Sequence, residues 1–336
     1  MRVLLNLRMV LIGSFITLIL IPFNIVPSYA QGVYPSKPIT LTVGYGPGGS
    51  TDLATRVLAP VMEKILRQPI VVINKPGAST AIQMEFVRHS APDGYTLGVF
   101  VTGGMVGTAL REVPYHFFND FTHIAQFAKF ILGIQVHPES PWKTLKELVE
   151  YGQQNPGKLR YCALTAGTSS HLLAEQFAHL NNIKWVYVPV ESDAAITPAL
   201  LGKHVDVGFI SVPGFKSFVK TGKLRLLAVF NDTRLSDFPD SPTLKETGFN
   251  SGGLEESFVF GIFGPKNLPK DITEKISYAV RTASKDQDFI KLIESQGSVP
   301  KYRDADEWIS FLKKEDEEVI RIMRRIGLKV IRDPYK

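Results

Sequence analysis

The chain has 336 residues, of which 44% are hydrophobic, 21% charged and 10% aromatic. At roughly 100–200 residues per domain, this length predicts two domains, and the composition excludes a disordered chain, a collagen-like chain and a disulfide scaffold. The 38 Lys and Arg against 32 Asp and Glu give a net charge of +6. The basic residues occur singly or in pairs and are mixed with acidic ones, so we expect no nucleic-acid partner.

The first thirty residues have the pattern of a secretory signal peptide. Arg2 and Arg8 precede an apolar run over 9–26, and the small residues Ser28 and Ala30 follow it. Small residues at these two positions predict cleavage after Ala30. We therefore expect an exported protein whose mature chain starts near residue 31.

An uncleaved membrane anchor is the alternative for this segment. The apolar run is about the shortest that could span a bilayer, and Pro22 and Asn24 interrupt it. The lone cysteine, Cys162, cannot form an intramolecular disulfide. It lies in a predicted strand, so we interpret it as a small buried core residue rather than a nucleophile.

Strand and helix patterns alternate along the mature chain, which predicts an α/β fold. Strands at 39–45, 70–74 and 96–101 alternate with helices at 50–67 and 79–89. After Pro138 we expect helices at 145–155, 170–180 and 194–201, and strands at 159–163, 185–188, 205–210 and 224–230. An apolar strand at 258–263 and two amphipathic helices at 270–284 and 304–326 follow.

Two α/β units without a long linker predict two lobes, each a mainly parallel sheet flanked by helices. Apolar stretches at 127–136 and 258–263 are the expected crossings between the lobes. Lobe 1 would hold residues 31–130 and 257–336, and lobe 2 residues 131–256. In such folds ligands bind beside the carboxyl ends of strands, here in a cleft between the lobes.

A glycine-rich loop at 44–52 joins the first strand to the first helix and matches G-x-G-x-x-G. A dinucleotide site would need an acid at the end of the second strand, where this chain has Asn74-Lys75. Pro47 also removes one backbone N–H. We therefore interpret the loop as an anion site, with Ser50 as N-cap and the helix N-terminus as the source of positive potential. A turn that only caps its helix is the simpler alternative.

A second loop at 165–171 has the same character, because Thr168, Ser169 and Ser170 place three hydroxyls before a predicted helix. A third strand–helix junction at 188–193 contains Glu191 and Asp193 and is a poorer anion site. Helix N-termini that converge on one cleft would bind a small anion through neutral dipoles.

Several motifs resemble the substrate-binding proteins of tripartite tricarboxylate transporters, the Bug family. The resemblance is collinear over nearly all of residues 34–300. Its motifs are YPSKPI at 34–39, GPGGSTD at 46–52, QPIVV at 68–72, NKPGA at 74–78, APDGYTL at 91–97, NPGKL at 155–159, GTSSHL at 167–172, VDVG at 205–208 and KTGKLR at 220–225.

This resemblance implies a two-lobed periplasmic binding protein that closes on a small carboxylate, such as a di- or tricarboxylate, an acidic amino acid or an aromatic acid. It implies two membrane subunits as partners, and we expect a monomer without cofactor or metal. The carboxylate would be anchored by main-chain and hydroxyl groups, with ordered water helping. The expected ligand-binding residues are Tyr45, Gly48, Gly49, Ser50, Thr51, Asp52, Asn74, Ala78, Gly167, Thr168, Ser169, Ser170, Ser192 and Ser211.

The chain departs from the family pattern at 188–192 and at Val259, so the specificity of a relative does not transfer. A sensory partner that presents ligand to a membrane kinase remains an alternative, because its ligand site would be the same. A secreted hydrolase is the other alternative. Its best candidates, Ser169 or Ser170 with His171, are adjacent residues at a helix start, which point in different directions and do not form a nucleophile–base pair.

Overall fold

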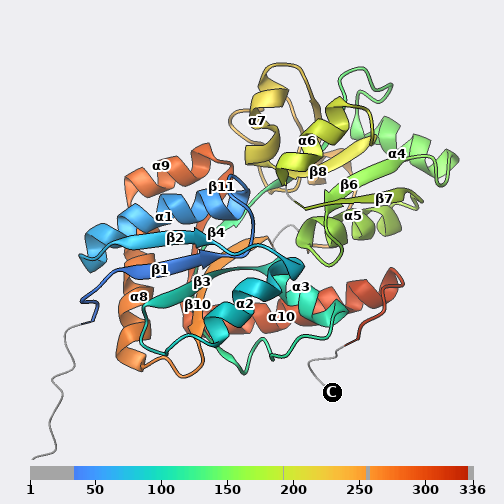
Figure 1. Cartoon of the computed structure of the whole chain (residues 1–336). Coiled ribbons are helices and arrows are strands. Elements are labelled where there is room, and N and C mark those ends of the chain that lie inside the picture. The colour runs from blue at the N-terminus through green and yellow to red at the C-terminus, as the bar shows by residue number, and fades with distance from the viewer. Residues whose placement is uncertain (1–33, 192, 255–257, 332–336) are drawn as a thin grey trace, which may run out of the picture. The chain divides into compact units, whose positions relative to one another are not determined.

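The computed structural model describes residues 34–191, 193–254 and 258–331 (Figure 1). Residues 34–336 form one compact unit. The predicted signal peptide, its cleavage site and Ser192 lie outside the described residues. Within the described part, no helix has both the length and the apolar character needed to cross a membrane.

The first sheet has the strand order β11-β4-β10-β3-β1-β2. Its strands are β1 (Ile39–Val43), β2 (Ile70–Asn74), β3 (Thr96–Val101), β4 (Phe121–Phe130), β10 (Val259–Pro265) and β11 (Ser298–Arg303). The helices associated with it are α1 (Ser50–Leu66), α2 (Ala81–Arg88), α3 (Thr102–Leu110), α8 (Lys270–Ala283), α9 (Gln287–Ser295) and α10 (Ala305–Arg325), with a short 3₁₀ turn η1 (Ala78–Thr80).

The second sheet has the order β7-β6-β8-β5-β9. Its strands are β5 (Leu132–Val136), β6 (Arg160–Leu164), β7 (Val186–Val190), β8 (Val207–Ser211) and β9 (Arg225–Val229). The helices of this region are α4 (Leu145–Gln154), α5 (Ser169–Leu180), α6 (Asp193–Leu201) and α7 (Val212–Lys220), followed by the 3₁₀ turn η2 (Lys245–Thr247).

The predicted α/β class, with two sheets flanked by helices, is confirmed, but the pairing is more mixed than the mainly parallel sheets that we expected. In the first sheet β1 pairs parallel with β2 and β3, whereas β10 is antiparallel to β3 and β4. In the second sheet β6 is parallel to β7 and β8, whereas β5 is antiparallel to β8 and β9. The reason is the route of the chain, because β4 runs almost directly into β5 and β10 returns beside β4.

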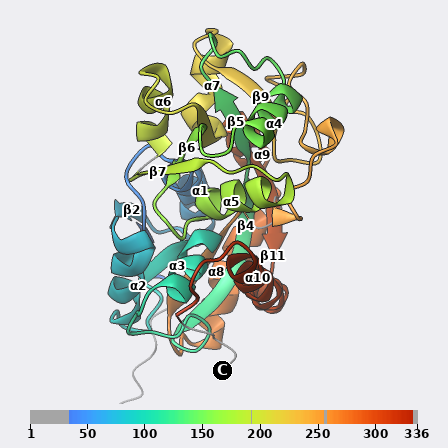
Figure 2. The same ribbon diagram turned by 90° about the vertical axis from the view of Figure 1, so that its right-hand side faces the viewer.

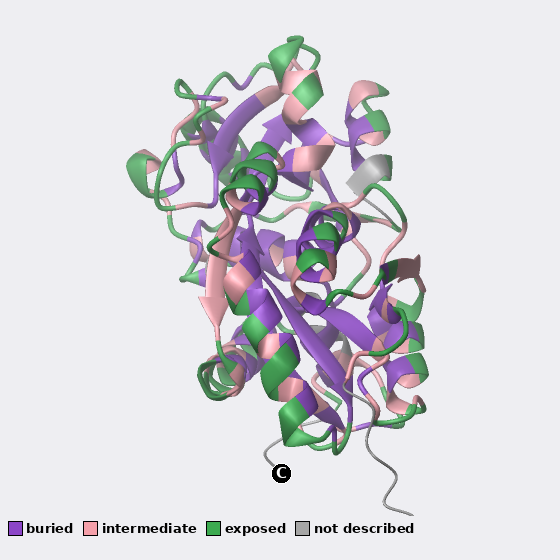
Figure 3. Cartoon of the chain, turned by 90° about the vertical axis from the view of Figure 1, so that its left-hand side faces the viewer, coloured by how far each residue is buried: buried purple, intermediate pink, exposed green. Residues whose placement is uncertain are grey.

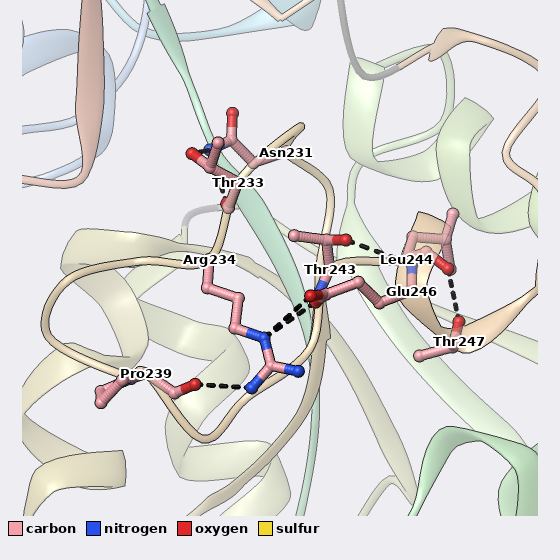
Figure 4. A network of polar contacts seen from close by, with 8 residues as sticks. All are labelled: Asn231, Thr233, Arg234, Pro239, Thr243, Leu244, Glu246 and Thr247. Atoms are coloured by element: carbon pink, nitrogen blue, oxygen red, sulfur yellow. Dashed lines mark hydrogen bonds and ion pairs between the residues drawn. The ribbon is translucent and has the colours of Figure 1, made fainter.

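The return from β9 to β10 is stabilised by polar side chains rather than by a further strand (Figure 4). Arg234 Nε donates to both carboxylate oxygens of Glu246, at 3.1 and 2.9 Å, and its Nη1 donates to the Pro239 carbonyl at 2.7 Å. Glu246 in turn accepts the Thr243 N–H at 2.8 Å, and Glu246 N–H donates to Thr243 Oγ1 at 3.2 Å. These contacts join Arg234, Pro239, Thr243 and Glu246 where the chain leaves the second sheet.

The largest group of buried apolar side chains includes residues of both sheets. Strands β4 and β10 of the first sheet are buried along most of their length (Figure 3). Helix α10 packs against β4 (Figure 2). Trp308 of this helix is fully buried, and a Cβ atom at Gly261 of β10 would come within 2.4 Å of its ring. Glycine at 261 therefore lets the indole pack directly on the sheet.

Candidate ligand-binding site

A single pocket is lined by residues from both sheets and from the loops that follow their strands. It encloses about 540 Å³ of space between atoms, part of which is open to solvent. Its described lining consists of Tyr45, Gly46, Gly49, Ser50, Thr51, Val101, Phe130, Leu132, Leu164, Thr168, Ser169, Ser170 and Glu191.

The start of helix α1 forms one wall of this pocket. Gly48 has a φ of 81°, which favours glycine, and Gly49 is the N-cap residue with a φ of −77°. The prediction that Ser50 caps the helix is wrong, because the extended conformation falls on Gly49 and Ser50 is the first helical residue. The N–H groups of Ser50 and Thr51 therefore have no acceptor within the helix.

Asp52 in the first turn of α1 is 2% exposed and lies behind the lining. Its carboxylate accepts bonds from Gly48 N–H at 3.0 Å and from Arg56 Nε at 3.0 Å. Burial raises the pKa of this carboxyl, but the bonds from Arg56, Gly48 and Asn74 outweigh it, so the pKa lies below its ordinary value. Asp52 is thus a charged residue that holds the loop.

Asn74, at the end of β2, completes this cluster. Its Nδ2 donates to the Tyr45 carbonyl and to Asp52 Oδ1, both at 2.9 Å. Its Oδ1 accepts from Arg56 Nη2 at 3.1 Å. We call Asp52, Arg56 and Asn74 the Asp52 cluster; none of its members lines the pocket.

The start of helix α5 forms the facing wall. Gly167 has a φ of 84°, and Thr168 is the N-cap residue without a side-chain capping bond. Ser170 Oγ accepts the Leu164 N–H at 3.2 Å. The Ser169 hydroxyl oxygen is buried, and no hydrogen-bond partner for it occurs among the residues that the structure describes. A lining hydroxyl without a partner is a candidate donor to a ligand.

His171 has the same place in this loop as Asp52 has in the first. The Gly167 N–H donates to His171 Nδ1 at 3.4 Å, four residues on. Burial lowers the pKa of His171 to about 4, so the ring is neutral at pH 7 and can accept that bond. Its ring centroid lies 4.4 Å from that of Tyr187. Both glycines of positive φ are therefore bonded to a side chain in the first turn of the following helix.

The remaining lining is mostly apolar. Val101, Phe130 and Leu132 are buried residues at the ends of β3 and β4 and the start of β5. Leu164 ends β6, and exposed Glu191 follows β7. No Lys, Arg or His belongs to the described lining.

The pocket brings together seven of the residues that the sequence indicated, namely Tyr45, Gly49, Ser50, Thr51, Thr168, Ser169 and Ser170. Gly48, Asp52, Asn74 and Gly167 lie in or against the same loops without lining it, and Ala78, in η1, and buried Ser211, the N-cap residue of α7, are also outside the lining. Val259 packs in the core rather than on the pocket.

Six lining residues were not among the expected ligand-binding residues: Gly46, Val101, Phe130, Leu132, Leu164 and Glu191. Gly46 and Glu191 were noted only as parts of the first and third loops. Val101, Phe130 and Leu164 end their strands and Glu191 follows β7 directly, which is where ligands bind in open α/β sheets, whereas Leu132 begins β5. The rule that ligands bind at strand ends could have indicated these residues, but it does not by itself say which strand ends share a pocket.

A nucleophilic cysteine and a metal site are two other kinds of functional site that a chain can contain. Cys162 is fully buried in the second sheet, and burial raises the pKa of its thiol to about 11. Among the described residues, no group of three or more His, Cys, Asp and Glu could hold a metal ion.

Two α/β sheets that share one pocket, with two helix N-termini in its wall, define the class of periplasmic solute-binding proteins. The family model of the tripartite tricarboxylate transporter family receptor, TctC, matches residues 54–328. The chain belongs to this family. The Bug-family resemblance seen in the sequence is thereby confirmed.

Individual relatives also match most of this chain. A Cupriavidus necator protein described as UPF0065 protein in gbd 5'region is 32% identical over 309 residues, which are 90% of this chain and 91% of that protein. The periplasmic binding protein BugD is 25% identical with a TM-score of 0.80, covering 88% of this chain and 99% of BugD.

Two further structures support the fold at 24% identity. An R. palustris protein solved with adipate has a TM-score of 0.82, covering 88% of this chain and 99% of its own. MatC from Rhodopseudomonas palustris with bound malate has a TM-score of 0.74, covering 88% and 100%.

Proposed function

We propose that this chain is an exported solute-binding protein that captures a small carboxylate in the periplasm and delivers it to the two membrane subunits of a tripartite tricarboxylate transporter. The observation that carries the proposal is the pocket wall, in which the N-termini of α1 and α5 both supply lining residues. Each N-terminus has N–H groups without intrahelical acceptors and a positive dipole end, which together favour an anion.

The anion would be held by neutral donors. The backbone N–H groups of Ser50 and Thr51, and the hydroxyls of Thr168 and Ser169, belong to lining residues. Arg56, the basic residue next to the first loop, already bonds Asp52 and Asn74. The carboxylates adipate and malate in two structural relatives are consistent with this ligand class.

The remaining parts of the proposal follow from this role. Residues 31–130 with 257–336 form one lobe and 131–256 the other, and the lobes close on the ligand as a monomer. The signal peptide is removed after Ala30. The protein binds its ligand without converting it, and it needs neither metal nor organic cofactor.

A thermal-denaturation screen tests the ligand class. The screen compares mono-, di- and tricarboxylates with the primary amides of the same acids. A ligand at 100 times its Kd stabilises the folded state by about 2.7 kcal/mol. We expect at least one carboxylate to raise the melting temperature while its amide does not. Equal stabilisation by acid and amide, or no stabilisation by any acid, would contradict the proposal.

A further inference from the structure

We infer that the preferred ligand is a monocarboxylate with an apolar body that carries a hydrogen-bond donor, such as an ammonium or hydroxyl group, and not a di- or tricarboxylate. The inference rests on the proposed function, since it assumes that a carboxylate is bound at the two helix N-termini. It names the chemical class that the rest of the pocket accepts.

The positive potential of the described lining matches one carboxylate. A helix N-terminus is equivalent to about half an elementary charge, so α1 and α5 together offset about one negative charge. The described lining contains no Lys, Arg or His that could offset a second. Arg56 is bonded within the Asp52 cluster, and the guanidinium of Arg111 donates to the Ala166 carbonyl at 3.4 Å, outside the lining.

Glu191 adds a negative charge to the pocket. It is exposed, it follows β7 directly, and it belongs to the lining. A second ligand carboxylate beside it would meet a like charge, which is repulsive and selects against such ligands. An ammonium or hydroxyl group in the same place would instead donate a bond to it.

The middle of the pocket suits a hydrocarbon body. Phe130 is 7% exposed and Leu132 is 2% exposed, and Val101 and Leu164 line the same cavity. A charged group against these side chains would lose its hydration without gaining a partner. An apolar ligand body would bury its own surface there at a gain. The N-termini of α1 and α5 thus favour one carboxylate on the ligand, and the apolar surface disfavours a second charge against it.

Three matched sets of ligands test the inference by titration calorimetry on the full mature chain. The sets share a body and differ at one end: butanoate, 4-aminobutanoate and succinate; hexanoate, 6-aminohexanoate and adipate; benzoate, 4-(aminomethyl)benzoate and terephthalate. In the set whose body fits, we expect the amino acid to bind at least tenfold tighter than the dicarboxylate, with the simple acid between them.

The variant Glu191→Gln removes the charge that makes this distinction. We expect it to weaken the amino acid and to strengthen the dicarboxylate, so that the ratio of their affinities falls at least fivefold, while the simple acid changes less than twofold. Glu294→Gln, at an exposed position of helix α9 outside the lining, is the matched control and should leave all three affinities unchanged.

The outcomes separate this inference from the proposed function. If a dicarboxylate is the tightest ligand of every set that binds and Glu191→Gln leaves the ratio unchanged, the inference is overturned while carboxylate binding stands. An Arg111→Gln variant that abolishes dicarboxylate binding would then identify the missing cation. If no acid of the three sets binds but another carboxylate stabilises the protein in the thermal screen, only the inference is overturned. If no carboxylate binds in either assay, the proposed function is contradicted as well.

Discussion

The carboxylate of Asp52 accepts the backbone N–H of Gly48 at 3.0 Å and so bonds the loop that leads into its own helix. Asp52 thus bonds its own loop and does not line the pocket, and its charge is offset by Arg56. His171 and Gly167 repeat the relationship in the second loop with a neutral acceptor. In both loops, a side chain in the first turn of the helix accepts a hydrogen bond from the N–H of the glycine that precedes the N-cap residue.

Asp52→Asn tests the role of this contact. The amide keeps the volume but loses the charge that accepts bonds from Gly48 and Arg56, and hydrogen bonds to charged groups contribute about 1.5–3 kcal/mol. We expect the free energy of unfolding in urea to fall by about that amount. We also expect ligand affinity to fall about tenfold although Asp52 does not line the pocket. An unchanged affinity would show that the loop does not depend on Asp52.

Acid should destabilise the protein through its buried histidines. Burial lowers the pKa of both His171 and His123 from 6.5 to about 4. The unfolded chain therefore binds these protons first as the pH falls below about 6.5, and stability is lost progressively until about pH 4. Each ring accounts for a loss on the order of 3 kcal/mol. Urea denaturation between pH 7 and pH 4 measures this loss.

Replacing each of the two histidines by glutamine separates the acid effect from the site. Both His171→Gln and His123→Gln should flatten the pH dependence, because each removes one depressed titration. Only His171→Gln should weaken ligand binding at pH 7, because His171 Nδ1 accepts the Gly167 N–H whereas His123 Nε2 lies by the Phe117 carbonyl. Equal effects of the two variants on affinity would argue against a role for His171 in the loop.

Ser169 and Ser170 are adjacent hydroxyls with different expected roles. Ser170→Ala removes the acceptor of the Leu164 N–H and should lower the free energy of unfolding by about 1 kcal/mol. Ser169→Ala removes a buried hydroxyl that has no partner in the described part of the chain, so stability should hardly change. The same variant should weaken carboxylate binding 10-fold or more, as measured by calorimetry. A reversed pattern would mean that the ligand bonds Ser170.

Ligand binding should bring the two lobes closer together. The pocket draws its walls from the loops of both sheets, so an anion bound to α1 and α5 at once favours the closed arrangement. Small-angle scattering should give a smaller radius of gyration with saturating ligand than without it. The same radius in both conditions would mean that binding does not require closure.

The pattern of the sequence was sufficient for most strands and for the two loops that line the pocket, because glycine, serine and threonine between a strand and a helix have a direct structural meaning. It was not sufficient for helix α3, where no helix was predicted. Helix α3 contains three glycines, and at Gly104 a Cβ atom would come within 2.7 Å of Thr80 Oγ1. Close packing therefore requires glycine at a position where propensity disfavours it.

Two further elements that contain proline, α7 and β11, were not predicted from the sequence. No helix was predicted at 212–220, yet Pro213 is compatible with the first turn of α7. Strand β11 contains Pro300 and pairs only at the edge of the first sheet, which is where a strand tolerates proline. Edge position depends on the whole sheet, and the local pattern does not contain it. The apolar lining of the pocket was not predicted for the same reason, because it forms only where strand ends from the two sheets meet.

Calorimetry of the tightest-binding carboxylate with Gly49→Val, Arg56→Gln and Arg111→Gln tests most directly whether neutral loops hold the anion. Gly49 has an ordinary φ, and its Cβ would meet only the Gly46 carbonyl, at 3.7 Å, so the variant should fold. We predict that Gly49→Val lowers affinity at least 30-fold by blocking the approach to the backbone, and that each arginine variant lowers it less than 10-fold. Greater loss in either arginine variant than in Gly49→Val would contradict the account, because the anion would then be held by charge.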